Sequence, residues 1–582
     1  MTQRSQWWPQ KEEVVAEHGM VVAKHPLAAE AGLDMLKRGG NAIDAAVATG
    51  FAISVVEPMM SCTAGVGFMN LYLAQQGQHV VVEYPPRAPV AATPDMYRLT
   101  GRPGTGISVY EVEGDENLEG YRSIAVAGTV AGLCRAHERY GTLPLEQVME
   151  PAIAYASDGF EVSWYLALCI ANTMRGLQRF PASSAVFLPD GRPPLSSPKP
   201  ADRVVQRDLA QVLRLIAKQG AAGFYQGDVA AAIAADMRAH GGLITRDDLA
   251  SYEATVRQPR RITYRDYEVA AAALPHGGTT MLQTLHMLSR LDLHGLDHNS
   301  PAYLHRFIET ARHAFADRYY YLGDNDVVEV PLEGILSREY AAALAGDIDL
   351  NATPFDALRD TEPWAHYATQ PLHDPWAYEG RRRPRAAAVP SLAADGDCTT
   401  HFGVVDKDRN LVSCTQTAVS LFGSRVTTPG LGLLWNNGMV WFNPKPGAAN
   451  SIAPWKRPLT NMAPLVALKG GAPALSLGSP GGRRIMNCNA QVFLNVAQFG
   501  MGMQEAIAQP RVDVSTKDVM VDSRIAPETL EALAALGHPL KVVEETAADS
   551  HFATPLGILV NPERGTLHSG VDVFRIAEAR GY

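Results

Sequence analysis

The chain has 582 residues, of which 46% are hydrophobic and 19% are charged, and these values are ordinary for a globular enzyme. Its 51 basic and 61 acidic residues give a formal net charge of −10, which argues against nucleic acid or an anionic membrane as a partner. The six cysteines are scattered without a Cys-x-x-Cys pair, so we expect neither a metal site nor a disulfide framework.

The start of the chain and its hydropathy predict where the protein resides. Residues 1–13 contain neither the apolar core nor the small-residue cleavage site of a secretory signal. A run of eighteen uncharged apolar residues, the length that crosses a membrane, does not occur in the sequence. We therefore expect a cytoplasmic protein without a membrane span.

The first hundred residues predict two helices and a strand. Residues 26–38 have helical apolar spacing and end in two glycines, which are a helix stop signal. Asn41 is a suitable N-cap for a second helix that runs to Val56. Residues 79–84 alternate as a strand does and lead into a proline-rich loop that contains Arg87.

A β-hairpin is predicted near residue 400. Two alternating runs, 399–406 and 411–417, flank a tetrapeptide of turn formers. If Val405 pairs with Leu411, Thr399 lies directly opposite Thr417, and a one-residue slip leaves the two threonines as neighbours on opposite faces. This pattern alone favours an ordinary hairpin with two solvent-facing threonines.

The stretch Asp397–Phe402, which reads DCTTHF, resembles the processing site of the γ-glutamyltransferase family of N-terminal nucleophile (Ntn) hydrolases. Further family-like stretches extend the resemblance over about residues 15–582, and they are 39–48, 241–249, 316–318, 456–462 and 478–482. The resemblance implies an α+β fold of the αββα type, in which two stacked antiparallel sheets lie between helical layers. It also implies a precursor that cuts itself before Thr399.

The resemblance assigns catalytic roles to four residues. The freed Thr399 would be the nucleophile and its own α-amine the general base, which suits an unperturbed α-amine pKa of about 7.7–8.0. We expect the Thr417 hydroxyl to hydrogen-bond Thr399. Gly481 and Gly482 correspond to the oxyanion hole of the family, whose backbone N–H groups stabilise a developing alkoxide, although a Pro-Gly-Gly sequence alone is typical of an ordinary turn.

The residues that bind glutamate in glutathione-cleaving relatives are largely replaced. Val419, Gly438 and Trp441 stand where those relatives have an Asn, a Gln and an Asp. Thr460 and Asn461 replace paired serines and can still donate hydrogen bonds. A carboxylate-binding arginine of the family aligns with Pro85, so Arg87 is either its substitute or a solvated loop arginine.

We therefore expect two fragments, 1–398 and 399–582, that remain one heterodimer, with a dimer of such units as a further possibility. Residues 351–398 would form a flexible end of the first fragment, and the basic run at 381–385 is read as part of that end and not as a nucleic-acid site. The expected reaction is hydrolysis or acyl transfer of a small amide other than glutathione, without metal or cofactor. Two alternatives stand beside it: a true γ-glutamyltransferase acting on glutathione, and an unprocessed, non-catalytic binding protein.

Overall fold

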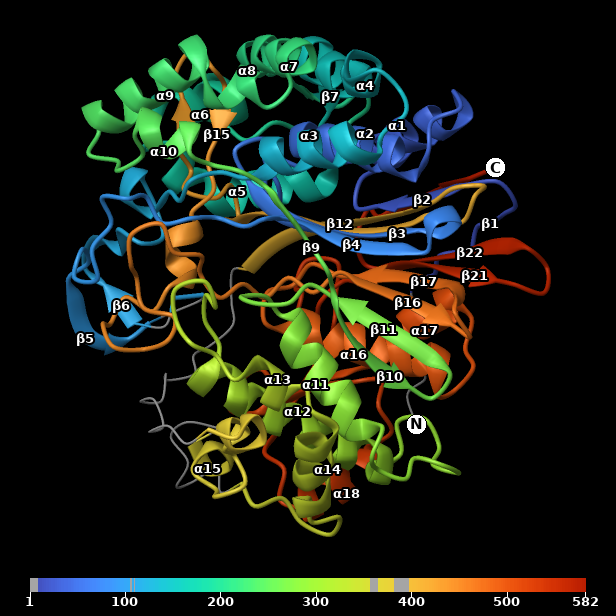
Figure 1. Cartoon of the computed structure of the whole chain (residues 1–582). Coiled ribbons are helices and arrows are strands. Elements are labelled where there is room, and N and C mark those ends of the chain that lie inside the picture. Colours follow the sequence, from blue (N-terminus) through green and yellow to red (C-terminus); the bar gives the residue numbers. More distant parts are fainter. Residues whose placement is uncertain (1–8, 105–106, 109, 356–364, 382–396) are drawn as a thin grey trace.

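The computed structural model describes residues 9–104, 107–108, 110–355, 365–381 and 397–582. Two seven-stranded antiparallel sheets form its centre (Figure 1). The upper sheet has the strand order β23 (Glu578–Gly581), β2 (Met20–Ala23), β12 (Asp397–Val405), β13 (Leu411–Ser420), β3 (Val66–Leu73), β4 (Gln78–Tyr84), β9 (Thr255–Arg257). The lower sheet has the order β1 (Val15–Ala16), β22 (Thr566–Val571), β21 (Leu556–Asn561), β17 (Ala472–Gly478), β16 (Leu465–Lys469), β11 (Tyr267–Ala271), β10 (Arg260–Tyr264).

Helices cover the outer face of each sheet, which gives the expected αββα arrangement (Figure 1). The helices on the side of the upper sheet are α1 (Pro26–Lys37), α2 (Ala42–Val56), α3 (Thr129–Tyr140), α4 (Leu145–Asp158), α5 (Trp164–Leu177), α6 (Pro181–Phe187), α7 (Arg207–Gln219), α8 (Ala222–Tyr225), α9 (Gly227–Ala239) and α10 (Arg246–Ala250). Those on the side of the lower sheet are α11 (Gly278–Leu288), α12 (Pro301–Tyr321), α13 (Leu332–Ile335), α14 (Arg338–Asp347), α15 (Ala365–Ala368), α16 (Arg484–Ala497), α17 (Met503–Ala508) and α18 (Pro527–Ala535).

Shorter elements complete the chain. Small sheets form between β5 (Leu99–Pro103) and β6 (Tyr110–Val112), β7 (Phe160–Glu161) and β8 (Arg203–Val204), β14 (Thr427–Thr428) and β15 (Leu433–Leu434), and among β18 (Val512–Asp513), β19 (Val519–Asp522) and β20 (Leu540–Val543). Single 3₁₀ turns are η1 (Ala74–Gln76), η2 (Glu113–Asp115), η3 (Tyr121–Ser123), η4 (Pro189–Gly191), η5 (Pro375–Glu379) and η6 (Gly438–Trp441).

The predicted helix signals near the N-terminus are confirmed. Helix α1 ends at Lys37, and Gly39 follows with a φ of +91°, which glycine adopts without steric cost. Asn41 caps α2 in a capping box with Asp44, so two of the helix's unpaired backbone N–H groups gain acceptors. Every residue of α2 is buried between the upper sheet and the outer helices.

The predicted hairpin is formed by β12 and β13, but its register changes at one residue. Thr400 through Val405 pair with Gln416 through Leu411, as predicted. Cys398 pairs instead with Val419, so the ladder shifts between Cys398 and Thr400. Thr399 therefore lies at a bulge and not directly opposite Thr417, and this position of the prediction was wrong.

The point between Cys398 and Thr399 divides the chain into two interleaved parts. In the upper sheet, β12, β13 and β23 come from residues after this point, and β2, β3, β4 and β9 from residues before it. The lower sheet is mixed in the same way, because β1, β11 and β10 flank four strands from the later part. A cut there would leave each part hydrogen-bonded to the other in both sheets.

Three further expectations concern the chain as a whole. All six cysteines are buried. Among the described residues, none of the helices is both long and apolar enough to cross a membrane. Half of the segment expected to be flexible, 356–364 and 382–396, lies outside the described residues.

Candidate active site

Two hydroxyls converge on the carbonyl oxygen of Cys398. The Thr399 Oγ1 hydroxyl donates to this oxygen at 2.6 Å, and the Thr417 hydroxyl donates to it at 2.5 Å. The two Oγ1 atoms are 3.4 Å apart, and Thr399 is only 3% exposed. The bulge leaves Thr399 outside the regular ladder, which brings its hydroxyl to the peptide bond that precedes it.

A cavity of about 230 Å³ opens at Thr399 and is lined on one side by Gly481. Gly481 and Gly482 have φ values of +139° and +58°, which only glycine adopts readily. A Cβ at Gly481 would also lie 2.6 Å from the Cα of Ala553, so a side chain has no room there. The backbone of the Pro-Gly-Gly turn at the edge of the cavity therefore requires glycine at residues 481 and 482.

Two buried charged groups, Glu57 and Lys24, line the same cavity. Burial raises the pKa of Glu57 to about 7, against the lowering effect of the Lys24 charge. Burial likewise lowers the pKa of Lys24 to about 8, and its Nζ donates to Thr554 at 2.9 Å. Both groups therefore change protonation near neutral pH, beside the candidate nucleophile.

Val419 and Trp441 form part of one apolar cluster between the sheets. Val419 has a φ of +87°, a conformation that is strained for a β-branched residue. Its backbone N–H donates to the Thr417 hydroxyl at 2.7 Å, so the strained residue holds the oxygen that contacts the Cys398 carbonyl. Val419 is thus fixed next to Thr417 by its backbone, while its side chain belongs to the apolar cluster.

Gly438 cannot hold a side chain in this arrangement. A Cβ there would lie 2.8 Å from the Cβ of Pro86 and 3.0 Å from that of Ala125. The amide that stands here in glutathione-cleaving relatives thus has no space in this chain.

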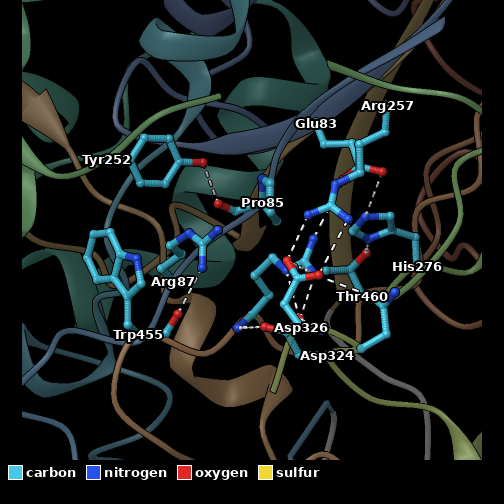
Figure 2. Close-up of polar contacts among 12 residues, drawn as sticks. Glu83, Pro85, Arg87, Tyr252, Arg257, His276, Asp324, Asp326, Trp455 and Thr460 are labelled. Atoms are coloured by element: carbon cyan, nitrogen blue, oxygen red, sulfur yellow. Dashed lines mark hydrogen bonds and ion pairs between the residues drawn. The ribbon is translucent and has the colours of Figure 1, made fainter. Parts of the chain in front are cut away.

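The loop that carries Thr460 and Asn461 is fixed by a buried ion-pair network (Figure 2). Arg457 contacts Asp324 at 2.5 Å, and its backbone N–H donates to the same carboxylate at 2.8 Å. Asp326 at 2.8 Å and Glu83 at 3.6 Å add two further carboxylates. The start of the family-like stretch 456–462 is thus anchored to Asp324.

Thr460 and Asn461 follow directly on this anchored segment. The Thr460 hydroxyl lies 3.4 Å from His276 Nδ1, and its backbone carbonyl accepts a hydrogen bond from Arg318 Nη2 at 2.9 Å. The same Arg318 nitrogen donates to Asn461 Oδ1 at 2.9 Å.

Arg87 lies away from these residues (Figure 2). Its guanidinium donates to the Trp455 carbonyl at 2.9 Å and lies 5.4 Å from the centre of the Trp455 ring. Burial lowers the pKa of Arg87. It lines neither the Thr399 cavity nor the cavity that contains Trp441 and Asn461, so its role as a substitute carboxylate ligand stays a prediction.

The sequence analysis did not assign three charged residues that the structure places here. Glu57 directly follows the helix predicted to end at Val56 and was given no role, Lys24 was not considered, and Arg318 was noted only within a family-like stretch. The sequence shows that these residues lie in or next to buried elements. It contains no motif or regular spacing that would place residues 24, 57 and 318 near residue 399.

The described residues contain one group with metal-ligand side chains, His305, Glu309 and His538, whose ligand atoms lie within 4.8 Å of one another. His305 Nδ1 and His538 Nε2 are hydrogen-bonded to each other at 2.7 Å, and Arg312 lies 3.4 Å from His538 Nδ1. These nitrogens thus have protein partners, and a neighbouring guanidinium disfavours a cation. We assign this group a structural role.

A threonine beside its own preceding carbonyl, between two antiparallel sheets flanked by helices, defines an Ntn-type amidohydrolase. Comparison with known proteins agrees. The family described as "Gamma-glutamyltranspeptidase" matches residues 28–579. The acylase ACY 1 proenzyme of Pseudomonas sp. (strain V22) is 38% identical over 91% of this chain and 88% of its own length. The glutathione hydrolase proenzyme of Bacillus subtilis (strain 168) is 35% identical over 98% of this chain and 92% of its own length.

A solved structure shows the same fold over the whole chain. The cephalosporin acylase from Bacillus halodurans superposes with a TM-score of 0.83 at 27% identity, covering 100% of this chain and 99% of that one. The chain therefore belongs to the γ-glutamyltranspeptidase family, as its motifs predicted. It is a γ-glutamyltransferase-like enzyme, and the non-catalytic alternative is not favoured.

Proposed function

We propose that the chain cuts itself between Cys398 and Thr399 and then cleaves an amide whose acyl group is not γ-glutamyl. The observation that supports the first step is the contact of the Thr399 and Thr417 hydroxyls with the Cys398 carbonyl. The names of the relatives, which are proenzymes, also support it.

Self-cleavage would proceed as an N-to-O acyl shift. Thr399 Oγ1 attacks the Cys398 carbonyl carbon and gives up its proton, and the Thr417 hydroxyl stabilises the negative charge that develops on the carbonyl oxygen. The C–N bond then breaks, and the amine takes a proton. Water hydrolyses the resulting ester, which leaves a Cys398 carboxylate and a Thr399 with a free α-amine.

The freed Thr399 would repeat this chemistry on a substrate. Its α-amine accepts the hydroxyl proton as Oγ1 attacks the substrate carbonyl, and the departing amine receives that proton. The backbone N–H groups of Gly481 and Gly482 would stabilise the oxyanion, each such donor typically contributing about 2.7–4 kcal/mol to the transition state. Water, or a second amine, then removes the acyl group from Thr399.

The substrate side of the site supports an acyl group without an α-ammonium. Val419 and Trp441 are apolar neighbours, and Gly438 leaves no space for an amide side chain. Burying an unpaired ammonium among such side chains costs several kcal/mol. Two of the relatives are named as acylases, one of them a cephalosporin acylase, which agrees with an acyl amide other than glutathione.

The test compares two substrates that differ only in the ammonium. We expect kcat/KM for glutaryl p-nitroanilide to exceed that for γ-glutamyl p-nitroanilide by about two decades or more. This chain lacks at least two of the charge-assisted contacts that hold the γ-glutamyl group in glutathione-cleaving relatives, and each such contact contributes about 1.5–3 kcal/mol. A strong preference for the glutamyl compound would instead identify an ordinary γ-glutamyltransferase.

The two fragments would form a heterodimer, because both contribute strands to both sheets. Pairing of such heterodimers and a cytoplasmic location are further parts of this proposal. Cell fractionation and a sedimentation measurement of the mature protein would test these two parts.

A further inference from the structure

The Thr399 cavity has one carboxylate among several cations. Glu57, which directly follows α2, is the only acidic residue among the described residues that line the cavity. Three cations share this lining: Lys24, Arg484 and Arg575. All four residues are at most 6% exposed, so salt and water screen their charges only weakly.

The three cations have neutral partners. Lys24 Nζ donates to the Thr554 hydroxyl at 2.9 Å. The two arginines donate to backbone carbonyls, which belong to Gly481, Ser550 and His551 for Arg484 and to Thr546, Ala547 and Phe574 for Arg575. In the described part of the chain, none of the three forms a contact ion pair with a carboxylate. The negative charge of Glu57 thus remains available to a further cation in the cavity.

Glu57 is also close to the candidate nucleophile along β12. Burial raises the pKa of Glu57, and the neighbouring Thr400 hydroxyl lowers it. Neither Glu57 Oε2 nor Thr400 Oγ1 makes a hydrogen bond of regular geometry in the described structure, so the carboxylate can accept another donor. Thr400 directly follows Thr399, and consecutive Cα atoms are about 3.8 Å apart. The carboxylate therefore lies about one residue from the nitrogen that self-cleavage would free.

Self-cleavage would change the hydrogen-bonding needs of Thr399. Before the cut its backbone nitrogen carries one hydrogen, and afterwards the protonated α-amine carries three. Thr399 is only 3% exposed, and a buried cation requires acceptors or a counter-charge. The protonated amine would also add a positive charge to a lining that already has three. Among the described residues of this lining, Glu57 is the group that can supply the counter-charge.

We propose that the Glu57 carboxylate binds the α-amine of the freed Thr399 and orients it toward the Thr399 hydroxyl, while the Lys24 charge favours loss of the proton from that amine. This inference rests on the proposed role of Thr399 as an N-terminal nucleophile and adds a positioning residue to it. A carboxylate beside an ammonium keeps it protonated to higher pH, and a neighbouring cation has the opposite effect. Glu57 and Lys24 together would set the pH at which the amine can act as a base.

Further titratable or charged groups surround this pair, and they are Lys11, Tyr165, Cys169, Cys398, His401, Arg484, Asp572 and Arg575. Burial raises the pKa of Cys169 to about 12 and lowers that of His401 to about 3, so neither changes charge between about pH 5 and pH 9. Burial also raises the pKa of Tyr165 above this range. Glu57 and Lys24, with pKa values of about 7 and about 8, do change charge within it.

The experiment measures the pKa of the Thr399 α-amine in the mature protein without using turnover. The amine is labelled with acetic anhydride over a range of pH, and mass spectrometry quantifies the label on the N-terminal peptide of the 399–582 fragment. We expect Glu57→Gln to lower this pKa by about one unit or more, and Lys24→Met to raise it. A purely structural role of the two residues would not produce shifts of opposite sign.

Glu309→Gln is the control, because Glu309 is also 1% exposed but does not line the Thr399 cavity. It should leave the pKa of the amine unchanged. An amine pKa in mature Glu57→Gln equal to that of the parent would overturn the proposal. If Glu57→Gln fails to mature, Lys24→Met decides the question, and an amine pKa that does not rise in this variant overturns it.

The kinetics of the mature variants give a second readout on whichever of the two p-nitroanilides the parent hydrolyses faster. Glu57→Gln should lower kcat at least about tenfold with KM within a few-fold of the parent, because the base loses its orientation while the substrate contacts remain. The acid limb of kcat/KM should move to lower pH together with the amine pKa. A small fragment that does not begin with Thr399 would refute the proposed function itself. An active Glu57→Gln enzyme with an unchanged acid limb would overturn only the role of Glu57.

Discussion

Thr417 contacts both partners of the proposed self-cleavage, the Thr399 hydroxyl and the Cys398 carbonyl. We expect Thr417→Ala to mature about 10²–10³-fold more slowly, because one donor to the developing oxyanion is lost. Thr417→Ser, which keeps the hydroxyl, should mature within a few-fold of the parent. The measurement is the rate at which the full-length band disappears on a denaturing gel. Maturation of the alanine variant at the parental rate would show that this contact has no catalytic meaning.

Glu57 gives maturation a predicted pH dependence. Self-cleavage precedes the free α-amine, so titration of that amine cannot affect its rate. With a folded-state pKa of about 7, the Glu57 carboxylate becomes available as a proton acceptor as the pH rises from 6 to 8. We expect the maturation rate of precursor from cell-free synthesis to rise over this range. The other charged or titratable groups that line the same cavity are Lys24, Tyr165, Cys398, Arg484 and Arg575.

Glu57→Gln should mature more slowly and with a flatter dependence on pH. Lys24→Met should move the rise to higher pH, because the Lys24 charge lowers the pKa of Glu57. A rise that is unchanged in both variants would contradict the role of this pair. The contribution of Glu57 to folding stability falls over the range in which the maturation rate rises. Because the pKa of Glu57 is higher in the folded state, this contribution is fully present below pH about 4.5 and is lost as the pH rises through about 7.

At the scale of elements, the β12–β13 hairpin joins Thr399, the proposed nucleophile, to Val419. Val419 near the end of β13 replaces an amide of glutathione-cleaving relatives, and its φ of +87° suits asparagine better than a β-branched side chain. We expect Val419→Asn to raise kcat/KM for γ-glutamyl p-nitroanilide about 10–100-fold relative to the glutaryl compound, since it restores one hydrogen bond to a charged group.

Val419→Ala is the control for loss of the branched side chain and should leave the ratio of the two substrates within a few-fold of the parent. An unchanged ratio in a Val419→Asn enzyme that matures normally would exclude this residue as a determinant of acyl specificity.

The hairpin also shows what the sequence could predict. The alternation of apolar and polar residues and the turn at 407–410 correctly predicted six of its residue pairs, from Thr400–Gln416 to Val405–Leu411. The bulge at Thr399 was not predictable, because it depends on how Cys398 and Val419 meet near the end of the ladder. Glu57 and Lys24 were missed for a similar reason: their place at the Thr399 cavity becomes visible only once the fold brings residues 24, 57 and 399 together.

At the scale of the whole molecule, the αββα fold followed from family-like motifs, whereas the interleaving of the two parts became visible only in the strand order. Because each part supplies strands on both sides of the other, we expect the mature fragments to elute together in gel filtration at any salt concentration. Only denaturant should separate them. Elution of a free 399–582 fragment under native conditions would contradict the strand order described here.

The central claim is that Thr399 both cuts the chain and becomes its N-terminal nucleophile. The most direct test is intact-mass analysis of the purified protein, together with N-terminal sequencing of its small fragment, for the parent and for Thr399→Ala. We predict two species in the parent, residues 1–398 and 399–582, with the small one beginning Thr-Thr-His. Thr399→Ala should give a single inactive chain of about 62.8 kDa. A cleaved Thr399→Ala protein, or a parent small fragment that begins at another residue, would contradict the claim.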